Sequence, residues 1–312
     1  MWSTLQHRVG EAVVEHSVVA EDLAKLYPGG VWGVRRVSFR VRRGSVAVLL
    51  GPNGAGKTTT IGILATLLRP TRGRAEVLGM DVVRDASRVR RAIALCPQDV
   101  SPDGNWSPLE AVTGFLYTRG LDLSTARREA RRWLEELDLW GVRDRPCTQL
   151  SGGQRKRVMV AATLATGAEV MFLDEPTAGL DVEGRYKVWR ALRRVVRDGA
   201  TILMTTHMMD EASMVSDHVV LIARGVVVAE GRVDDLVSKL PYRYRVVAKG
   251  VRNKQLSGLP TVELGDRVIV YAESRSEAFS IASGIEAESV SVDPVDLEDA
   301  YMYLTQGVKK CA

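Results

Sequence analysis

The segment from Val46 to Thr60 constrains the fold of this chain more than any other part of its sequence. It reads VAVLLGPNGAGKTTT, in which five apolar residues precede a glycine-rich loop and the start of a helical pattern. A short apolar run that ends at Gly-Pro predicts a buried strand. A helix follows from about Gly56, and the loop between them has the spacing of a phosphate-binding P-loop. A plain glycine-rich turn is the alternative, but the strand before it and the helix after it favour the P-loop.

The residue types of this loop suit a nucleotide phosphate. Glycines let several backbone N–H groups turn toward one centre, and a helix N-terminus adds about half a positive charge there. Lys57 can reach the β- and γ-phosphates, and the Thr58 hydroxyl can ligate Mg²⁺. The residues expected to contact the phosphates are Gly51, Pro52, Asn53, Gly54, Ala55, Gly56, Lys57, Thr58 and Thr59.

Two acidic residues directly follow a second apolar run. Residues 170–173 read as a buried strand, and Asp174 and Glu175 come after it. Asp174 is placed to hold Mg²⁺ through water, and Glu175 is a candidate to orient or deprotonate an attacking water. His207 likewise follows a strand, expected at residues 201–205. Because ligands of parallel sheets bind at the carboxyl ends of the strands, we expect these groups and the P-loop to share one edge.

A second anion site is predicted in the middle of the chain. Residues 150–154 read LSGGQ and precede a helical pattern. Ser151 is a natural N-cap, and the two glycines leave N–H groups accessible at the start of the helix. Phosphoryl transfer needs several positive donors around the γ-phosphate, yet this site lies far from Lys57 in the sequence. The displacement suggests that two chains face each other and that each completes the site of the other.

The order of the elements predicts an α/β fold. Strands alternate with helices on both sides of a helical segment at about 100–166, which indicates a mixed, mostly parallel sheet with right-handed crossovers and a helical insertion. The apolar–polar alternation at 37–41 predicts a strand in an antiparallel part of the sheet. Residues 1–15 look like a lead-in, 16–236 like the main domain, and 237–312 like a small α+β domain without chemistry of its own.

Composition narrows the choice of partners. The net charge of +5 is mild and gives no reason to expect nucleic acid. The three cysteines are scattered without a C-x-x-C pair, so neither a disulfide framework nor a zinc site is expected. No apolar run approaches the roughly 20 residues that span a bilayer. We therefore expect a soluble chain that can dock on a membrane protein.

Together these motifs resemble the nucleotide-binding subunit of an ATP-binding cassette (ABC) transporter. LSGGQ combined with a P-loop is close to diagnostic of that family, and further motifs of the family occur in its order and approximate spacing. The match covers about residues 17–236. The matching positions are Gln98 in the Q-loop, Leu150–Gln154 in the signature, Asp174 and Glu175 in the Walker B motif, Ala178–Asp181 in the D-loop and His207 in the H-loop.

The resemblance implies ATP hydrolysis with Mg²⁺ and assigns roles around the scissile phosphate. Glu175 would be the catalytic base, and His207 would contact the γ-phosphate. Gln98 would contact Mg²⁺ or the lytic water and report to the membrane partner. Tyr27 matches the aromatic residue that stacks on adenine, with Trp32 as a rival for that role.

The resemblance also implies a second nucleotide-binding subunit, either a copy of this chain or a homologue. Ser151 and Gly153 would bind the γ-phosphate of ATP held by the opposite subunit, and Asp181 would couple the two sites. Gly152 and Gln154 complete the same signature segment.

The C-terminal tail adds a more specific resemblance. Residues 293–305 read DPVDLEDAYMYLT and are similar to the end of daunorubicin-resistance-type exporter ATPases, which work with separate membrane subunits of the ABC-2 kind. This implies an exporter ATPase that lies in the cytoplasm, peripheral on the inner face of the cell membrane, and drives separate transmembrane permease subunits. The alternative is a soluble ABC ATPase in nucleic-acid, ribosome or iron–sulfur assembly work. The single cassette, the tail and the lack of a long coiled coil before the signature argue against it.

Overall fold

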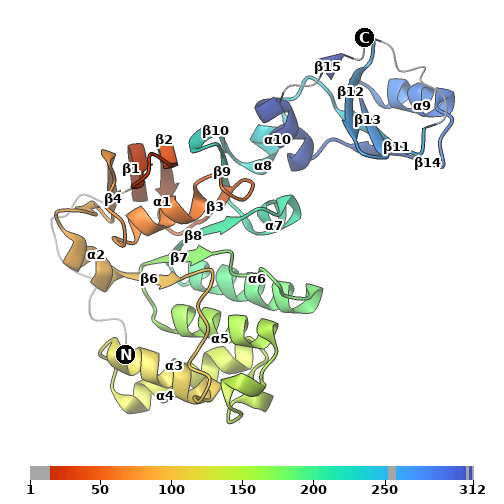
Figure 1. The fold of residues 1–312 in the computed structure, drawn as a ribbon. Helices are drawn as coiled ribbons and strands as arrows, with labels where there is room; N and C mark the ends of the chain where they lie inside the picture. Colours follow the sequence, from red (N-terminus) through yellow and green to blue (C-terminus); the bar gives the residue numbers. More distant parts are fainter. Residues whose placement is uncertain (1–14, 252–257, 307–308, 311–312) are drawn as a thin grey trace. The chain divides into compact units, whose positions relative to one another are not determined.

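The computed structural model describes residues 15–251, 258–306 and 309–310 (Figure 1). Residues 1–14 of the predicted lead-in therefore lie outside the described residues. Chain contacts divide the protein into two compact units. The first unit contains the described residues up to Ala47 together with Gly54–Thr205 and Arg224–Val226, and the second contains Val48–Asn53, Thr206–Ala223 and the described residues from Val227 onward. The boundaries expected from the sequence, 16–236 and 237–312, remain a prediction.

The first unit contains the antiparallel strands that the sequence predicts. β1 (His16–Leu26) pairs with β2 (Trp32–Arg42) and with β4 (Arg72–Val77), and β5 (Met80–Asp81) pairs with β4. The register of β1 against β2 shifts between Ala20 and Leu23, next to Asp22 at φ 47°. Such a β-bulge breaks the two-residue period on which a sequence-based prediction depends.

Parallel strands form the other part of the first unit. β6 (Ile93–Cys96) pairs with β7 (Val170–Asp174), and β7 pairs with β8 (Thr201–Thr206). All residues of β7 and β8 are buried, as expected for strands covered on both faces. Because the strands are parallel, their carboxyl ends lie at one edge, where Asp174 is opposite Thr205. The helices α1 (Lys57–Leu64), α2 (Ala86–Ala92) and α6 (Val182–Arg197) belong to the same unit.

The helical insertion lies between β6 and β7 in the chain. It consists of α3 (Pro108–Thr118), α4 (Leu123–Glu136) and α5 (Gly152–Ala165), which pack on one another (Figure 1). Two short 3₁₀ turns, η1 (Trp140–Val142) and η2 (Cys147–Gln149), connect α4 to α5. α3 begins with a capping box between Ser107 and Glu110, and the Asp122 carboxylate caps α4. The predicted helical insertion is thus confirmed.

Three further strands, β3 (Val46–Leu50), β9 (His218–Ala223) and β10 (Val226–Gly231), belong to the large sheet. β3, the strand before the P-loop, is fully buried, as its apolar run predicts. β9 and β10 are joined by Arg224 and Gly225, both at positive φ, as in a tight hairpin. The large sheet has the order β5-β4-β1-β2-β10-β9-β3-β8-β7-β6.

The second unit contains a separate five-stranded antiparallel sheet. Its strands are β11 (Tyr244–Lys249), β12 (Pro260–Leu264), β13 (Arg267–Ala272), β14 (Ser289–Pro294) and β15 (Lys309–Lys310), in the order β14-β11-β13-β12-β15. Its helices are α7 (Met209–Val215), α8 (Val233–Val237), α9 (Arg275–Gly284) and α10 (Leu297–Gln306). Within the described ranges, no helix has both the length and the apolar composition of a membrane span.

Candidate functional site

Two P-loop glycines occupy positions where a side chain would not fit. Gly56 precedes α1 with φ 104°, and a Cβ there would lie 2.5 Å from the carbonyl oxygen of Gly33. In the second unit, a Cβ on Gly51 would collide with the carbonyl oxygen of Ile222, while the Gly51 N–H donates to the Thr206 carbonyl at 3.3 Å. α1 starts without a side-chain cap and without an acidic residue in its first turn. Its N-terminus therefore retains the positive end of the helix dipole for an anion.

Two predicted site residues converge on the carboxylate of a third in the first unit. Lys57 Nζ lies 3.5 Å from Glu175 Oε1, and both side chains are more than nine-tenths buried. Gln98 Nε2 donates to the other oxygen, Glu175 Oε2, at 3.4 Å. These residues come from the start of α1, the loop after β6 and the end of β7, so distant parts of the sequence build one polar centre. Glu175 has φ 46°, a strained conformation for a residue with a side chain.

Thr205 is a site residue that the sequence-based prediction missed. Its hydroxyl donates to Asp174 Oδ1 at 2.5 Å and accepts a hydrogen bond from the Glu175 N–H at 3.0 Å. Thr205 is fully buried at the end of β8, in register with Asp174. The signal that could have identified it is a threonine at the carboxyl end of a buried strand. This hydroxyl holds the side chain of one predicted acidic residue and the backbone of the other.

Tyr27 lies beside the helix that follows the P-loop. Its hydroxyl is 3.2 Å from Thr59 Oγ1, and Gly33 leaves the space that the tyrosine ring occupies, because a Cβ there would be 2.6 Å from Tyr27 Cε2. Trp32, the alternative adenine-stacking residue, is instead covered by the Arg72 guanidinium at 5.9 Å from the ring centroid. The Tyr27 ring likewise has Lys25 Nζ at 5.7 Å from its centroid, so which of the two rings stacks on adenine remains a prediction.

The signature segment and the D-loop both end in helix caps. The Gln154 N–H donates to Ser151 Oγ at 3.2 Å and the Ser151 N–H donates to Gln154 Oε1 at 3.0 Å, which forms a capping box at the start of α5. Asp181 Oδ1 accepts from the Gly184 N–H at 2.8 Å and caps α6. The capping role expected for Ser151 is confirmed, whereas the sequence did not identify Asp181 as a cap.

Several predicted residues lie at the surface. His207 follows β8 in the second unit and is exposed, as are Pro52 and Asn53. Among the residues that the structure describes, no three His, Cys, Asp or Glu side chains form a metal cluster. Mg²⁺ is bound in nucleotide sites by one or two carboxylates together with water and substrate phosphates. The roles of Asp174, Thr58 and Gln98 toward Mg²⁺ remain predictions.

Comparison with known proteins finds one family model and several relatives that match this chain. The family model described as ABC transporter matches residues 34–178. The chain is 39% identical over 283 residues to the daunorubicin resistance ATP-binding protein DrrA3 of Streptomyces coeruleorubidus, which covers 86% of this chain and 90% of that protein. It is 40% identical over 221 residues to the doxorubicin resistance ATP-binding protein DrrA of Mycobacterium tuberculosis, which covers 70% and 67%.

A solved structure shows the same fold. CbiO1 from Clostridium perfringens, part of the ABC transporter complex CbiONQ, superposes with a TM-score of 0.64 at 27% identity. The superposition covers 72% of this chain and 92% of that structure.

Proposed function

Since this chain belongs to the ATP-binding subunits of ABC transporters, we propose that it powers an exporter in which two such subunits close on ATP and drive separate membrane subunits. Its ABC-type ATPase fold and its relatives make it an ATPase that uses ATP with Mg²⁺. These relatives are transporter subunits, so the comparisons give no support to a soluble role in nucleic-acid, ribosome or iron–sulfur work. The observation that carries the proposed mechanism is the convergence of Lys57 and Gln98 on Glu175.

This convergence supports Glu175 as the base in ATP hydrolysis. The Glu175 carboxylate would accept a proton from the water that attacks the γ-phosphorus, while the bond from that phosphorus to the bridging oxygen of ADP breaks. Lys57 is paired with Glu175 in this structure. When the phosphates bind, the Lys57 ammonium would move to them, and Glu175 would be free to take the proton. Asp174 and Thr58 would hold Mg²⁺, and Gln98 would position the water.

A second subunit would supply the remaining donors. Ser151 and Gln154 bond to each other rather than to the centre around Glu175, so the start of α5 presents the Gly152 and Gly153 region to another molecule. A Cβ on Gly152 would meet no atom within 4 Å. We infer that this helix start binds the γ-phosphate of ATP held by the opposite subunit and that Asp181 couples the two sites.

The decisive variant is Glu175→Gln, which keeps the shape of the side chain and removes the proton acceptor. We expect ATP hydrolysis to fall at least about 100-fold and an ATP-bound dimer to accumulate. Size-exclusion chromatography with ATP and a phosphate-release assay measure the two effects. Lys57→Ala is the control, because it should lose nucleotide affinity and give no dimer. A Glu175→Gln protein that remains monomeric with ATP, or hydrolyses it normally, contradicts the two-subunit mechanism.

We also propose that the chain lies on the inner face of the cell membrane, held by its permease subunits. The relatives DrrA3 and DrrA are ATP-binding proteins of drug resistance, and CbiO1 is part of a transporter complex. Affinity purification of the tagged chain from detergent-solubilised native membranes should recover a multi-span membrane protein. Recovery of the chain only from the soluble fraction, with no membrane protein bound, contradicts this location.

A further inference from the structure

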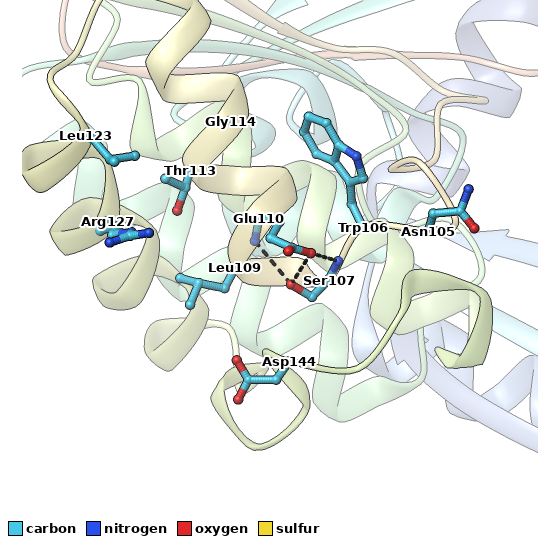
Figure 2. A pocket seen from close by; sticks show the side chains of 10 residues that line it. All are labelled: Asn105, Trp106, Ser107, Leu109, Glu110, Thr113, Gly114, Leu123, Arg127 and Asp144. Carbon is cyan, nitrogen blue, oxygen red and sulfur yellow. Dashed lines mark hydrogen bonds between the residues drawn. The ribbon is translucent and has the colours of Figure 1, made fainter.

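The helical insertion contains a hollow that none of the predicted nucleotide-site residues lines. It has a volume of about 650 Å³ and opens between α3 and α4 (Figure 2). This size falls in the range of roughly 300–1,000 Å³ that is typical of small-molecule sites. Leu109 and Thr113 line it from α3, and Leu123 and Arg127 line it from α4. Each pair is four residues apart, so each presents two side chains on one face of its helix.

Thr113 supplies a polar group that lacks a partner. The residue is 7% exposed, and among the described residues its Oγ1 finds no hydrogen-bond partner. Figure 2 shows this hydroxyl pointing into the space between Leu109 and Arg127. A buried hydroxyl without a partner costs free energy, which a ligand atom in the hollow would recover.

Three charged side chains line the hollow, namely the carboxylates of Glu110 and Asp144 and the guanidinium of Arg127. The Glu110 carboxylate is engaged by the Ser107 N–H at 2.8 Å and the Ser107 hydroxyl at 2.9 Å, and Asp144 pairs with Arg143 at 3.1 Å. No ion pair or hydrogen bond engages the Arg127 guanidinium within the described part of the chain. A free guanidinium binds carboxylate or phosphate by two parallel hydrogen bonds. Arg127 is therefore the charged group of the hollow that is available to bind a ligand.

We propose that this hollow binds a small amphipathic anion that diffuses freely in solution. Its apolar body would pack on Leu109 and Leu123, whose side chain is 49% exposed in the free protein. Its carboxylate or phosphate would pair with Arg127, and an acceptor oxygen would take the hydrogen bond of Thr113. The site is separate from the nucleotide site and does not rest on the proposed transport function.

Calorimetric titration of the full chain with octanoate, and with 1-octanol as the uncharged match, tests the proposal. We expect octanoate to bind at least tenfold more tightly than octanol. Arg127→Gln should remove most of this difference. Arg128→Gln is the matched control, because Arg128 neighbours Arg127 but bonds to Thr125 Oγ1 at 2.9 Å instead of lining the hollow. Equal affinity for octanoate and octanol, or equal losses in the two arginine variants, overturns the proposal.

Thr113→Val separates ligand binding from a structural effect. This variant keeps the side-chain shape and removes the unpartnered hydroxyl, so octanoate affinity should fall about tenfold while Tm stays equal or rises. A lowered Tm with unchanged affinity contradicts the ligand role of Thr113. Flotation with phosphatidylglycerol vesicles tests a membrane source: flotation that Arg127→Gln abolishes, in a protein that does not bind octanoate, overturns the proposal of a free ligand.

Discussion

The Thr205 hydroxyl links the two acidic residues at the end of β7. It uses its single proton for Asp174 and a lone pair for the Glu175 N–H, so its orientation is determined from both sides. Asp174 is itself 2% exposed, and a buried carboxylate needs such a donor. The positions of the proposed metal ligand and the proposed base thus depend on one hydroxyl that would contact neither ATP nor water.

Thr205→Val keeps the side-chain shape and removes both hydrogen bonds. We expect the free energy of unfolding to fall by about 1–3 kcal/mol, because the Asp174 carboxylate loses a buried donor. ATP hydrolysis should fall as well, whereas Thr205→Ser should restore both quantities. Urea denaturation and phosphate release provide the measurements. If Thr205→Ser were as impaired as Thr205→Val, packing of the methyl group rather than the hydroxyl would be the important feature.

Several functional segments coincide with the starts of helices. α1 begins at the P-loop without a side-chain cap, whereas α5 and α6 begin with the caps Ser151 and Asp181. An uncapped start leaves N–H groups for a ligand, and a capped start holds the chain in place before the helix. Residues proposed to act between two subunits therefore also stabilise the helices on which they lie.

Two substitutions at Asp181 separate its capping role from its charge. Asp181→Ala should lower the free energy of unfolding by about 1 kcal/mol, because the Gly184 N–H loses its acceptor. Asp181→Asn should retain the cap and the stability. If the charge couples the two ATP sites, both variants should show lower ATPase activity, which a phosphate-release assay measures. Normal activity in Asp181→Asn would restrict Asp181 to a structural role.

The start of α3 should respond to pH through Glu110. The backbone N–H and hydroxyl of Ser107 donate to its carboxylate and hold the pKa of Glu110 below its usual range. A lowered pKa means that this capping contribution is complete above the ordinary glutamate pKa and is lost as the pH falls through the lowered value. NMR titration of the carboxyl carbon should show this, and Ser107→Ala should raise the pKa of Glu110 part of the way. An unchanged value in Ser107→Ala contradicts the assignment.

At the scale of the whole molecule, the C-terminal sheet has a polar network of its own. Asp299 of α10 is fully buried and accepts from Arg245 Nη1 at 2.9 Å, the Tyr271 hydroxyl at 3.0 Å and the Asp296 N–H at 2.8 Å. Arg245 also pairs with Asp296 at 2.8 Å. These bonds tie α10 to β11 and β13. The tail that resembles the exporter ATPases therefore holds α10 against this sheet through buried polar bonds.

Asp299→Ala should strongly destabilise the C-terminal sheet, because the Arg245 guanidinium, the Tyr271 hydroxyl and the Asp296 N–H all lose their buried acceptor, although Arg245 keeps its pair with Asp296. We expect a loss of about 3–5 kcal/mol in the free energy of unfolding. Tyr271→Phe removes one neutral donor and should cost only about 1 kcal/mol. Urea unfolding followed by circular dichroism ranks the two variants. A smaller loss for Asp299→Ala than for Tyr271→Phe would contradict the ion-pair network.

Features that depend on neighbouring residues could be predicted from the sequence alone. The apolar runs of β3 and β7, the P-loop, the Ser151 cap and the chain order of the motifs were all predictable, because backbone conformation and burial pattern are local properties. Which distant groups meet depends on how the strands and helices pack. The register of β7 and β8 brings Thr205 to Asp174 across 31 residues, and the bulge at Asp22 shifts the register of β1 against β2. Such contacts depend on packing between strands and helices, which no local pattern encodes.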